Sequence, residues 1–402
     1  MRVVIAPDKF KGSLTAAEAA QAMRKGVLDA HPSAEIVVCT MADGGEGTVE
    51  ALAGATGAEM RTEEVSGPLP GQRVTARWAL MRPGGPQEKG GGAFPEDLSP
   101  AGPTGVVEMA QASGFALVPA GESDPFVTTT FGTGELITAA LDAGCIRLIV
   151  GVGGSATVDG GTGMASALGF RMLDEAGVEV PLGGGALARI RSIDASGRDP
   201  RLDRVAVLVA SDVDNPLVGE QGAARVYGPQ KGATPGQVEE LERGLDALGG
   251  LMKRDLGADV SLIPGAGAAG GLGAGLVAFC GARIVSGVEL VSGLVGLKEK
   301  IRGADLVLTG EGSFDSQTAR GKTPAGVVSV AAGEGVPAVI VAGRISGTEA
   351  PQGYRAAVFS VSPGPMTEEE AMSRAAELLR SGTARLVRLL DLGVAVDESA
   401  RG

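Results

Sequence analysis

Histidine is nearly absent from this chain, which contains one histidine among 402 residues. That residue, His31, precedes Pro32, and we expect it to lie in a solvated surface turn. A Ser-His-Asp hydrolase uses a histidine as its general base, and the lone turn histidine excludes that class. Acid–base chemistry must therefore depend on Asp, Glu or Lys side chains.

Cysteines and aromatic residues are also scarce. The three cysteines, Cys39, Cys145 and Cys280, lie far apart without the spacing of a metal site, and their odd number fits a reducing compartment. Aromatic residues make up 3% of the chain, too few for the stacking surfaces that bind single-stranded nucleic acid. The net charge of −13 repels DNA, RNA and anionic membranes, so an anionic substrate needs a local cluster of Lys, Arg or metal ions.

Long apolar segments are missing as well. Glycine or a charged residue interrupts every apolar run before about 18 residues, so we predict no membrane span. The N-terminus begins directly with a strand pattern, and no signal peptide is visible. We therefore expect a cytoplasmic protein. The sequence leaves open whether it forms a homo-oligomer.

Glycine, by contrast, is abundant, with 66 residues that gather after apolar runs. The richest group, GVGGSATVDGG at residues 151–161, follows an apolar run that predicts a buried strand. Ser155, Thr157 and Asp159 alternate within it, and ligands of α/β proteins bind at the carboxyl ends of strands. Asp159 is then either a general base beside a substrate or only a cap of the following helix.

Two turns near the N-terminus have the same character. The first predicted strand leads into a turn that suits a metal ion and a phosphate or carboxylate, although a surface turn with a helix cap fits equally well. Its polar residues are Asp8, Lys9, Lys11 and Ser13. The second predicted strand ends at Asp43, which the pair Gly44 and Gly45 follows. Capping explains this carboxylate, but it does not explain why glycines clear space around it.

Further polar turns follow later apolar runs. Asp212 has the hard oxygen atoms that Mg²⁺ prefers, and an Asx turn is the alternative. Lys231 lies in a glycine-rich turn as a candidate phosphate contact, against the commoner case of a surface lysine. Glu311 and Asp315 follow a predicted buried strand. Lys322 precedes Thr323, the expected N-cap of a helix, and a helix N-terminus beside a lysine favours an anion.

The order of predicted elements indicates two α/β domains. Residues 1–66 and 290–402 alternate strand and helix patterns and predict one domain with a parallel sheet. Residues 67–289 predict an inserted mixed α/β domain, because residues 73–80 alternate as a half-exposed antiparallel strand does. Residues 82–103 are rich in Gly and Pro and predict a flexible loop. We expect the active cleft between the two domains.

Three functions are compatible with these turns. Carboxylates that hold Mg²⁺, and lysines and backbone N–H groups that hold phosphate, are the parts of a phosphoryl-transfer site. Two GxGxxG/A matches, at residues 151–156 and 265–270, leave open an NAD-dependent hydroxy-acid dehydrogenase, although such matches are weak evidence in a glycine-rich chain. A non-catalytic sensor of small organic acids is the third interpretation.

The chain resembles the bacterial glycerate kinases, which phosphorylate D-glycerate with ATP and in some members yield 2-phosphoglycerate. The similar segments run in order along nearly the whole chain: IAPDKFKGSLTA, MADGGEGTVEAL, VEMAQASGFALVP, TTTFGTGELI, GVGGSATVDGG, DVDNPLVG, GPQKGAT, PGAGAAGGLGAGL and TGEGSFDSQTARGKTP. The resemblance implies ATP and Mg²⁺ as cofactors. It also implies a Rossmann- or flavodoxin-like domain built from both chain ends, with a second α/β domain inserted between them.

On this basis we expect Asp159 or Asp43 to accept the hydroxyl proton, with Lys11 beside them among the catalytic residues. The expected metal or outer carboxylates are Asp212, Glu311 and Asp315. The expected substrate or phosphate contacts are Asp8, Ser13, Gly44, Gly45, Ser155, Thr157, Lys231 and Lys322.

The sequence departs from the family pattern at three places, and the first two concern substrate positioning. Val158 stands where Asn is usual, and Ser313 stands where Arg is usual, so one expected positive charge is missing. The segment from Arg82 to Pro103 is longer than usual. None of these departures removes a carboxylate that we assign to catalysis.

Overall fold

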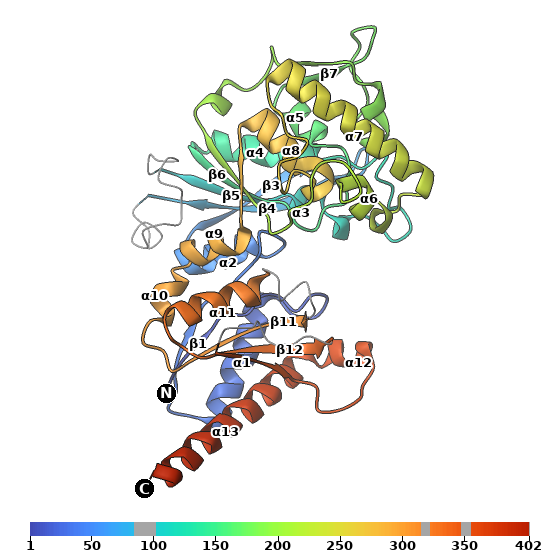
Figure 1. Cartoon of the computed structure of the whole chain (residues 1–402). Coiled ribbons are helices and arrows are strands. Elements are labelled where there is room, and N and C mark those ends of the chain that lie inside the picture. Colours follow the sequence, from blue (N-terminus) through green and yellow to red (C-terminus); the bar gives the residue numbers. More distant parts are fainter. Residues whose placement is uncertain (84–101, 315–321, 347–354, 402) are drawn as a thin grey trace.

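The structure is a computed structural model, and it describes residues 1–83, 102–314, 322–346 and 355–401. Two large β-sheets, each with helices on its faces, lie one above the other in Figure 1. Most of the expected loop between Arg82 and Pro103 lies outside the described residues, as does Asp315. The chain therefore has the expected α/β fold, with one parallel and one mixed sheet.

The first sheet joins the two ends of the chain in five parallel strands. In spatial order they are β13 (Ala356–Ser360), β12 (Ala338–Ile345), β11 (Leu306–Phe314), β1 (Arg2–Ile5) and β2 (Glu35–Val38). Counted along the chain, this is the order 2-1-3-4-5 of flavodoxin-like sheets. Ligands of such sheets bind beyond the carboxyl ends of the strands where the order reverses, which here lies between β1 and β11.

The second sheet has six strands and is mixed. In spatial order they are β10 (Arg283–Val285), β9 (Ala206–Ala210), β6 (Arg147–Gly151), β5 (Thr104–Glu108), β4 (Arg73–Met81) and β3 (Glu59–Ser66). The antiparallel strand expected over residues 73–80 is present as β4, in which Trp78 pairs with Val107 of β5. From β5 to β10 all neighbours are parallel.

Alternation along the strands gives each sheet two apolar faces. Val4 and Ile340 of the first sheet, and Ile149 and Leu208 of the second, belong to one core that lies between the sheets. Four helices complete this middle layer: α2 (Thr48–Thr56), α9 (Gly287–Leu294), α10 (Leu297–Ile301) and α11 (Thr323–Gly333). A shared core holds the carboxyl ends of both sheets at a fixed separation.

The outer face of the first sheet is covered by helices from opposite ends of the chain. These are α1 (Ala16–Ala30) and α13 (Ala375–Arg401), which lie side by side in Figure 1. A Cβ atom on Gly26 of α1 would lie 2.4 Å from the carbonyl oxygen of Arg380, so the crossing requires glycine. Thr15 is the N-cap of α1 and forms a capping box with Glu18.

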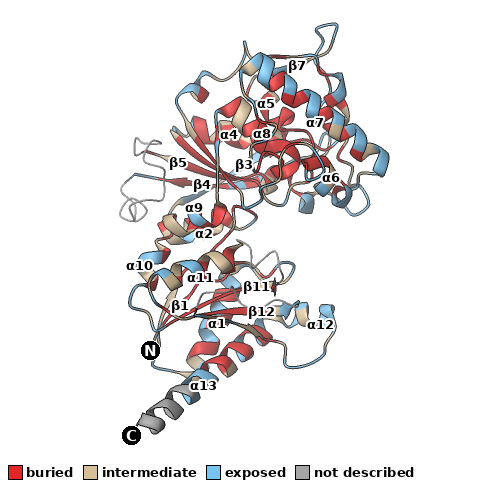
Figure 2. Cartoon of the chain, in the orientation of Figure 1, coloured by how far each residue is buried: buried red, intermediate tan, exposed pale blue. Residues whose placement is uncertain are grey.

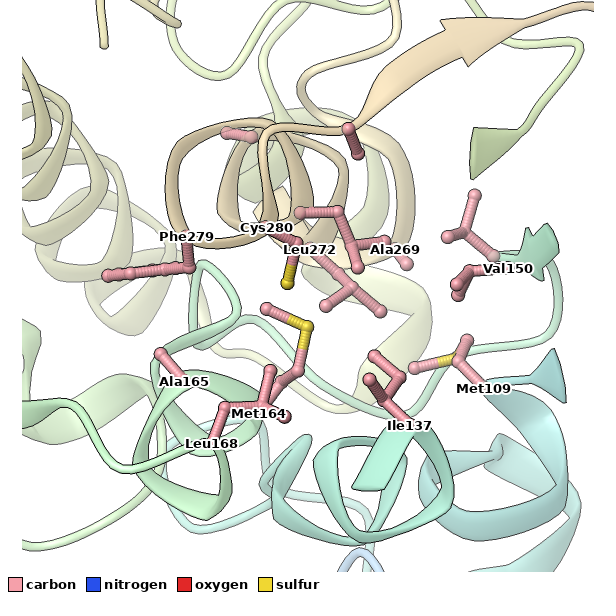
Figure 3. Close-up of a cluster of buried hydrophobic side chains, with 14 of the residues drawn as sticks. Met109, Ile137, Val150, Met164, Ala165, Leu168, Ala269, Leu272, Phe279 and Cys280 are labelled. Atoms are coloured by element: carbon pink, nitrogen blue, oxygen red, sulfur yellow. The ribbon is translucent and has the colours of Figure 1, made fainter. Parts of the chain in front are cut away.

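The outer face of the second sheet carries the largest core, coloured red in Figure 2. The longer helices over it are α4 (Phe131–Asp142), α7 (Pro235–Leu256) and α8 (Ala268–Cys280), with the short α5 (Thr162–Ala167) among them. In Figure 3, Met164 points into the space between Leu272 and Ile137. This packing fixes the turn that precedes α5, which is the glycine-rich turn 151–161.

Shorter elements complete the described chain. They are α3 (Ala110–Ser113), α6 (Ala223–Tyr227), α12 (Glu368–Ser373), β7 (Arg171–Leu173) and β8 (Ser192–Asp194), and the 3₁₀ helices η3 (Phe115–Leu117), η4 (Gly184–Arg189), η5 (Pro200–Asp203) and η6 (Pro229–Lys231). In the described residues, no helix has the length and apolar character to cross a membrane.

Two local expectations are wrong. The predicted buried strand before Glu311 continues to Phe314, because β12 pairs with it as far as Ile345, so Glu311 lies inside β11 and does not follow it. Thr323 is not the N-cap of α11: the cap is Lys322, and the Thr323 hydroxyl donates to Asp8 Oδ2 at 2.8 Å.

The domain division stays a prediction. The strands change from the first sheet to the second between β2 and β3, and back between β10 and β11. We propose that the two domains divide along this change, with the middle helical layer between them.

Candidate functional site

A cavity of about 480 Å³ opens where the carboxyl ends of both sheets face each other. The first sheet contributes Lys11, which follows β1, and the turn from Asp43 to Gly45, which follows β2. The second sheet contributes the turn from Gly153 to Ser155 after β6 and the segment from Ala210 to Val213 after β9. Its size is that of a small-molecule site, and its place is where α/β sheets bind ligands.

Glycines let the two sheets approach each other at this cavity. Gly44 has a φ of +82°, and a Cβ atom on it would lie 2.3 Å from the carbonyl oxygen of Ala210. A Cβ atom on Gly153 would lie 2.5 Å from the Cα atom of Gly45. The glycines that the sequence shows after each strand thus allow backbone-to-backbone contact between the two halves of the site.

One end of the cavity holds a network of charges around Asp43. Lys9 Nζ lies 3.8 Å from both Asp43 Oδ1 and Asp8 Oδ1. Burial raises the pKa of Asp8, and Lys9 opposes this shift. Burial alone would lower the pKa of Lys9, but Asp8 and Asp43 outweigh it and raise the pKa. Asp8 itself lies behind the wall, where it fixes the N-terminus of α11 through Thr323.

Asp212 lines the same end of the cavity from the second sheet. It accepts hydrogen bonds from Ser286 Oγ at 2.8 Å and from the backbone N–H groups of Gly287 and Val288, at the start of α9. Burial raises its pKa to about 6 despite these bonds, and the nearby charge of Asp43 adds to the rise. The two carboxylates therefore face a common space and repel each other.

The second sheet also brings a lysine and a serine to the cavity. Lys231 Nζ lies 2.7 Å from Ser155 Oγ and donates to the carbonyl oxygen of Thr157, also at 2.7 Å. The lysine is 3% exposed, and it has no carboxylate within ion-pair distance among the described residues. Burial lowers the pKa of Lys231 to about 7, and the charge of Asp159 opposes this shift only in part.

Asp159 does not line the cavity. Its side chain is fully buried, and its oxygens accept hydrogen bonds from Thr130 N and Thr130 Oγ1 at 2.8 Å and from the N–H groups of Gly161 and Gly163. Burial raises its pKa, although these bonds favour the charged form. Such a carboxylate holds residues 129–131 against the turn before α5. The geometry favours the structural alternative for Asp159 over the role of general base.

The structure brings together eight of the expected site residues around the cavity: Lys11, Asp43, Gly44, Gly45, Ser155, Asp212, Lys231 and Lys322. It places Ser13 and Thr157 outside the lining: Ser13 bonds the carbonyl of Phe10, and Thr157 is buried behind Ser155. Glu311 is also outside the lining, because β11 continues past it. Asp315 lies outside the described residues.

Sequence reasoning selected neither Lys9, which lies between the carboxylates of Asp8 and Asp43, nor two residues of the cavity lining. Tyr227 and Gln230 line the cavity beside Lys231, where only the lysine was selected. The one available signal was their position in the segment YGPQKGAT.

The two departures inside motifs lie away from the cavity lining. Val158 is fully buried in the core over the outer face of the second sheet, where an apolar side chain packs well. Ser313 lies on β11 opposite Arg344 of β12. Neither residue contacts the cavity.

The residues present suit a Mg²⁺ ion that is held partly by substrate. The described residues contain no group of three His, Cys, Asp or Glu side chains that would bind a metal by itself. Mg²⁺ bound with nucleotide phosphates, however, takes only one or two carboxylates from the protein. Asp43 and Asp212 meet this requirement because both face the cavity.

Comparisons with known proteins point to one enzyme family. The chain matches the model of the glycerate kinase family over residues 3–391. It is 46% identical to the glycerate kinase of Halalkalibacterium halodurans, over 94% of this chain and 95% of the relative. It is 44% identical to the glycerate 2-kinase of Escherichia coli K12, over 98% and 99%. A crystal structure of a Salmonella typhimurium LT2 protein, provisionally assigned as glycerate kinase 2, superposes with a TM-score of 0.81 at 44% identity, covering 98% of this chain and 99% of that one.

Proposed function

Because the chain belongs to the glycerate kinase family and is a kinase, we propose that it transfers the terminal phosphoryl group of ATP to D-glycerate with the help of Mg²⁺. We favour the 2-hydroxyl as acceptor, since a relative of 44% identity is named a glycerate 2-kinase. The observation that carries the proposal is the cavity itself, where lysines and carboxylates from both sheets converge.

The phosphate groups of the nucleotide bind on the side of the first sheet. Lys11 and Lys322 both line the cavity there. Lys322 is also the N-cap of α11, an eleven-residue helix whose free N–H groups and dipole favour an anion. Two lysines and a helix N-terminus offset the negative charge that a phosphoryl transfer must concentrate in one place.

Asp43 and Asp212 would hold the Mg²⁺ ion at the same end of the cavity. When bound, the ion neutralises phosphate charge and orients the transferred group. Lys9 keeps Asp43 in place, and the N-terminus of α9 keeps Asp212 in place, so both carboxylates are fixed before substrate arrives. The raised pKa of Asp212, about 6, arises mainly from burial, and the nearby charge of Asp43 adds to it.

The acceptor binds on the side of the second sheet. Ser155, Tyr227 and Gln230 line that side and offer hydroxyl and amide groups to the hydroxyls and carboxylate of glycerate. Because Asp159 is buried behind this wall, its role is to hold the turn that presents Ser155.

The two other interpretations lose their support. The glycines of residues 151–156 are followed by a loop to Thr162 before α5 begins, so they do not open a helix as a dinucleotide turn does. The match at residues 265–270 lies at the kinked start of α8, where Ala269 and Gly270 are not helical. Family membership also favours a kinase over a sensor. Cytoplasmic location and a homo-oligomeric state stay predictions.

The direct test is ³¹P NMR of the protein with D-glycerate, ATP and Mg²⁺. We expect loss of the ATP γ-phosphate signal and growth of a phosphomonoester signal whose coupling to carbon-bound protons identifies the 2-position. A matched sample with L-glycerate tests the handedness of the acceptor. Absence of any phosphomonoester signal with D-glycerate would overturn the proposal.

A further inference from the structure

The proposed function leaves one task without a residue, because the acceptor hydroxyl must lose its proton. A general base has to lie within hydrogen-bond reach of that proton, directly or through one bridging group. Asp159 is too deeply buried for this role, and Asp43 faces Lys9 at the phosphate end. Lys231 and Ser155 both line the cavity, on the side where the proposed function places the acceptor.

The surroundings of Lys231 favour an uncharged amine. Its nitrogen has two polar neighbours, the hydroxyl of Ser155 and the carbonyl oxygen of Thr157, and both are neutral. A buried ammonium group without a paired carboxylate is costly, so the group gives up its proton more easily. Burial accordingly lowers the pKa of Lys231 to about 7.

The hydrogen-bond geometry also fits a neutral amine. The Thr157 carbonyl accepts one N–H group of Lys231, which directs the amine lone pair elsewhere. Ser155 Oγ, at 2.7 Å, can donate its proton to that lone pair and accept another proton from the cavity. Ser155 and Lys231 both line the cavity, so the relay has one end at the substrate.

The backbone that carries Ser155 is rigid. Residues 114 and 155 form an antiparallel bridge, and Phe115 N donates to the carbonyl of Gly154 at 2.8 Å. Gly232, with a φ of +96°, closes η6 directly after Lys231. A relay of two side chains needs such fixed supports, because small displacements of reacting groups cost much of the rate.

Neighbouring polar and charged groups on the elements that pack near Lys231 have partners of their own. The turn 151–161 presents Asp159, whose charge raises the pKa of Lys231 and is itself stabilised by Thr130, Gly161 and Gly163. From α6, Tyr227 donates to Asn215 Oδ1 at 2.6 Å, and Arg225 pairs with Glu239.

Resting on the proposed function, we propose that Lys231 is the proton acceptor of the reaction and that Ser155 relays the proton from the glycerate hydroxyl to Lys231 Nζ. The hydroxyl O–H bond breaks as the new O–P bond forms, and the bond between the terminal phosphorus and ADP breaks. The Ser155 proton passes to Lys231, Ser155 takes the glycerate proton, and Lys231 later returns its proton to solvent through the open cavity.

The first test measures the rate of Lys231→Ala and its rescue by small primary amines. General-base catalysis contributes about 10²–10⁴-fold, so kcat should fall by that factor, and KM for ATP should change little. Ethylamine should restore part of kcat, and the restored rate should rise with pH as the free amine becomes more abundant. A lysine that only binds an anion predicts the opposite, because rescue would then follow the charged form and fade at high pH.

Three companion variants separate the relay from simple charge. Lys231→Arg keeps the positive charge but cannot act as a base near neutral pH, so it should be as slow as Lys231→Ala. Ser155→Ala should lower kcat while the Lys231 amine stays in place. Lys322→Ala is the matched control, a lysine of the same cavity on the phosphate side, and amines should not rescue it with a free-base pH dependence.

A second measurement does not depend on turnover and keeps the inference testable if variants fold poorly. NMR of the wild-type protein labelled in its lysine side chains should show one lysine that titrates near pH 7, and the Lys231→Ala spectrum should lack that signal. An ordinary lysine titration at position 231, or a fully active Lys231→Arg, would refute the relay. Inactivity of the wild type toward glycerate would instead refute the proposed function.

Discussion

Two glycine-rich turns with nearly the same composition have opposite environments in this protein. The turn after β2 places Asp43 beside glycines, and the turn after β6 places Asp159 beside glycines. Asp43 lines the cavity, whereas Asp159 is fully buried and bonded on both oxygens. The difference arises because the first turn faces the opposite sheet, while the end of the second turn packs under α4 and α8. Glycines beside a carboxylate indicate that other atoms pack closely against the turn. Whether these atoms belong to a ligand or to the protein depends on the elements that surround the turn.

The largest expected effect concerns the cation that the cavity carboxylates hold. Asp43 raises the pKa of Asp212 across the cavity, and we propose that both carboxylates hold a cation together with the nucleotide. We expect EDTA to abolish phosphoryl transfer and added Mg²⁺ to restore it, as followed by ADP release. Full turnover in metal-free buffer would contradict the assignment of both carboxylates.

Replacing Asp43 should have the next largest effect. Asp43→Asn keeps the size of the side chain and removes the charge, so kcat should fall by about 10²–10³-fold, as when one preorganised electrostatic contact is lost. The Mg²⁺ concentration for half-maximal rate should rise in the same variant. Asp159→Asn is the matched control, and its folded fraction should keep kcat within a few-fold of wild type. Equal losses in the two variants would erase the distinction between the turns.

Glu108 lies between the two turns and makes folding sensitive to pH. It ends β5, is 1% exposed, and its Oε1 accepts the N–H group of Val49 at 2.6 Å. Burial raises its pKa from 4.5 to about 7. Between these values the folded protein keeps a proton that the unfolded chain has lost, so this contribution to stability falls as pH rises from 4.5 to about 7. At about 1.4 kcal/mol per pKa unit, the full change is about 3.5 kcal/mol.

Glu108→Gln cannot ionise and should remove that pH dependence. Urea unfolding of the variant and the wild type near pH 5 and near pH 8 measures the difference. The exposed Glu122→Gln serves as a control and should follow the wild type. A variant that keeps the wild-type slope would show that Glu108 is already ionised in the folded protein at low pH.

Asp159→Asn should cost stability and spare the chemistry. The new amide group faces N–H groups that the carboxylate now satisfies, and a buried donor without its acceptor costs about 1–3 kcal/mol. We expect a lower melting temperature in thermal unfolding, whereas Asp43→Asn should melt close to wild type. A stable Asp159 variant with kcat reduced about 10²-fold or more would restore Asp159 as the base.

The smallest expected effect concerns Lys322 and tests whether this lysine binds the nucleotide or the acceptor. Lys322→Ala removes one charged contact at the N-terminus of α11, and KM for ATP should rise about 10-fold, equivalent to about 1.4 kcal/mol. KM for D-glycerate should stay unchanged. The exposed Lys25→Ala on α1 controls for the loss of a surface charge. A rise in KM for glycerate without a rise in KM for ATP would show that glycerate, and not the nucleotide, binds beside Lys322.

Much of the site could be predicted because polar residues that follow strands meet at one edge of a sheet. Lys11, Asp43, Ser155 and Asp212 each follow a strand, and all four line the cavity. The prediction for Glu311 failed because the sequence around it does not show that β12 pairs with β11 beyond this residue. The prediction for Thr323 failed because the sequence does not show that its hydroxyl lies beside Asp8, which is distant along the chain.

The sequence by itself determined the class of the fold, the edge of the sheets where the cavity lies, and the residue types available there, because strand periodicity, glycine turns and composition are local properties. Only the tertiary structure decided that Asp43 faces the cavity and Asp159 does not, and that Lys231 meets Ser155 from 76 positions away. Burial, and the pKa values that follow from it, depend on which surfaces the two sheets and their helices press together, and that is a property of the whole fold.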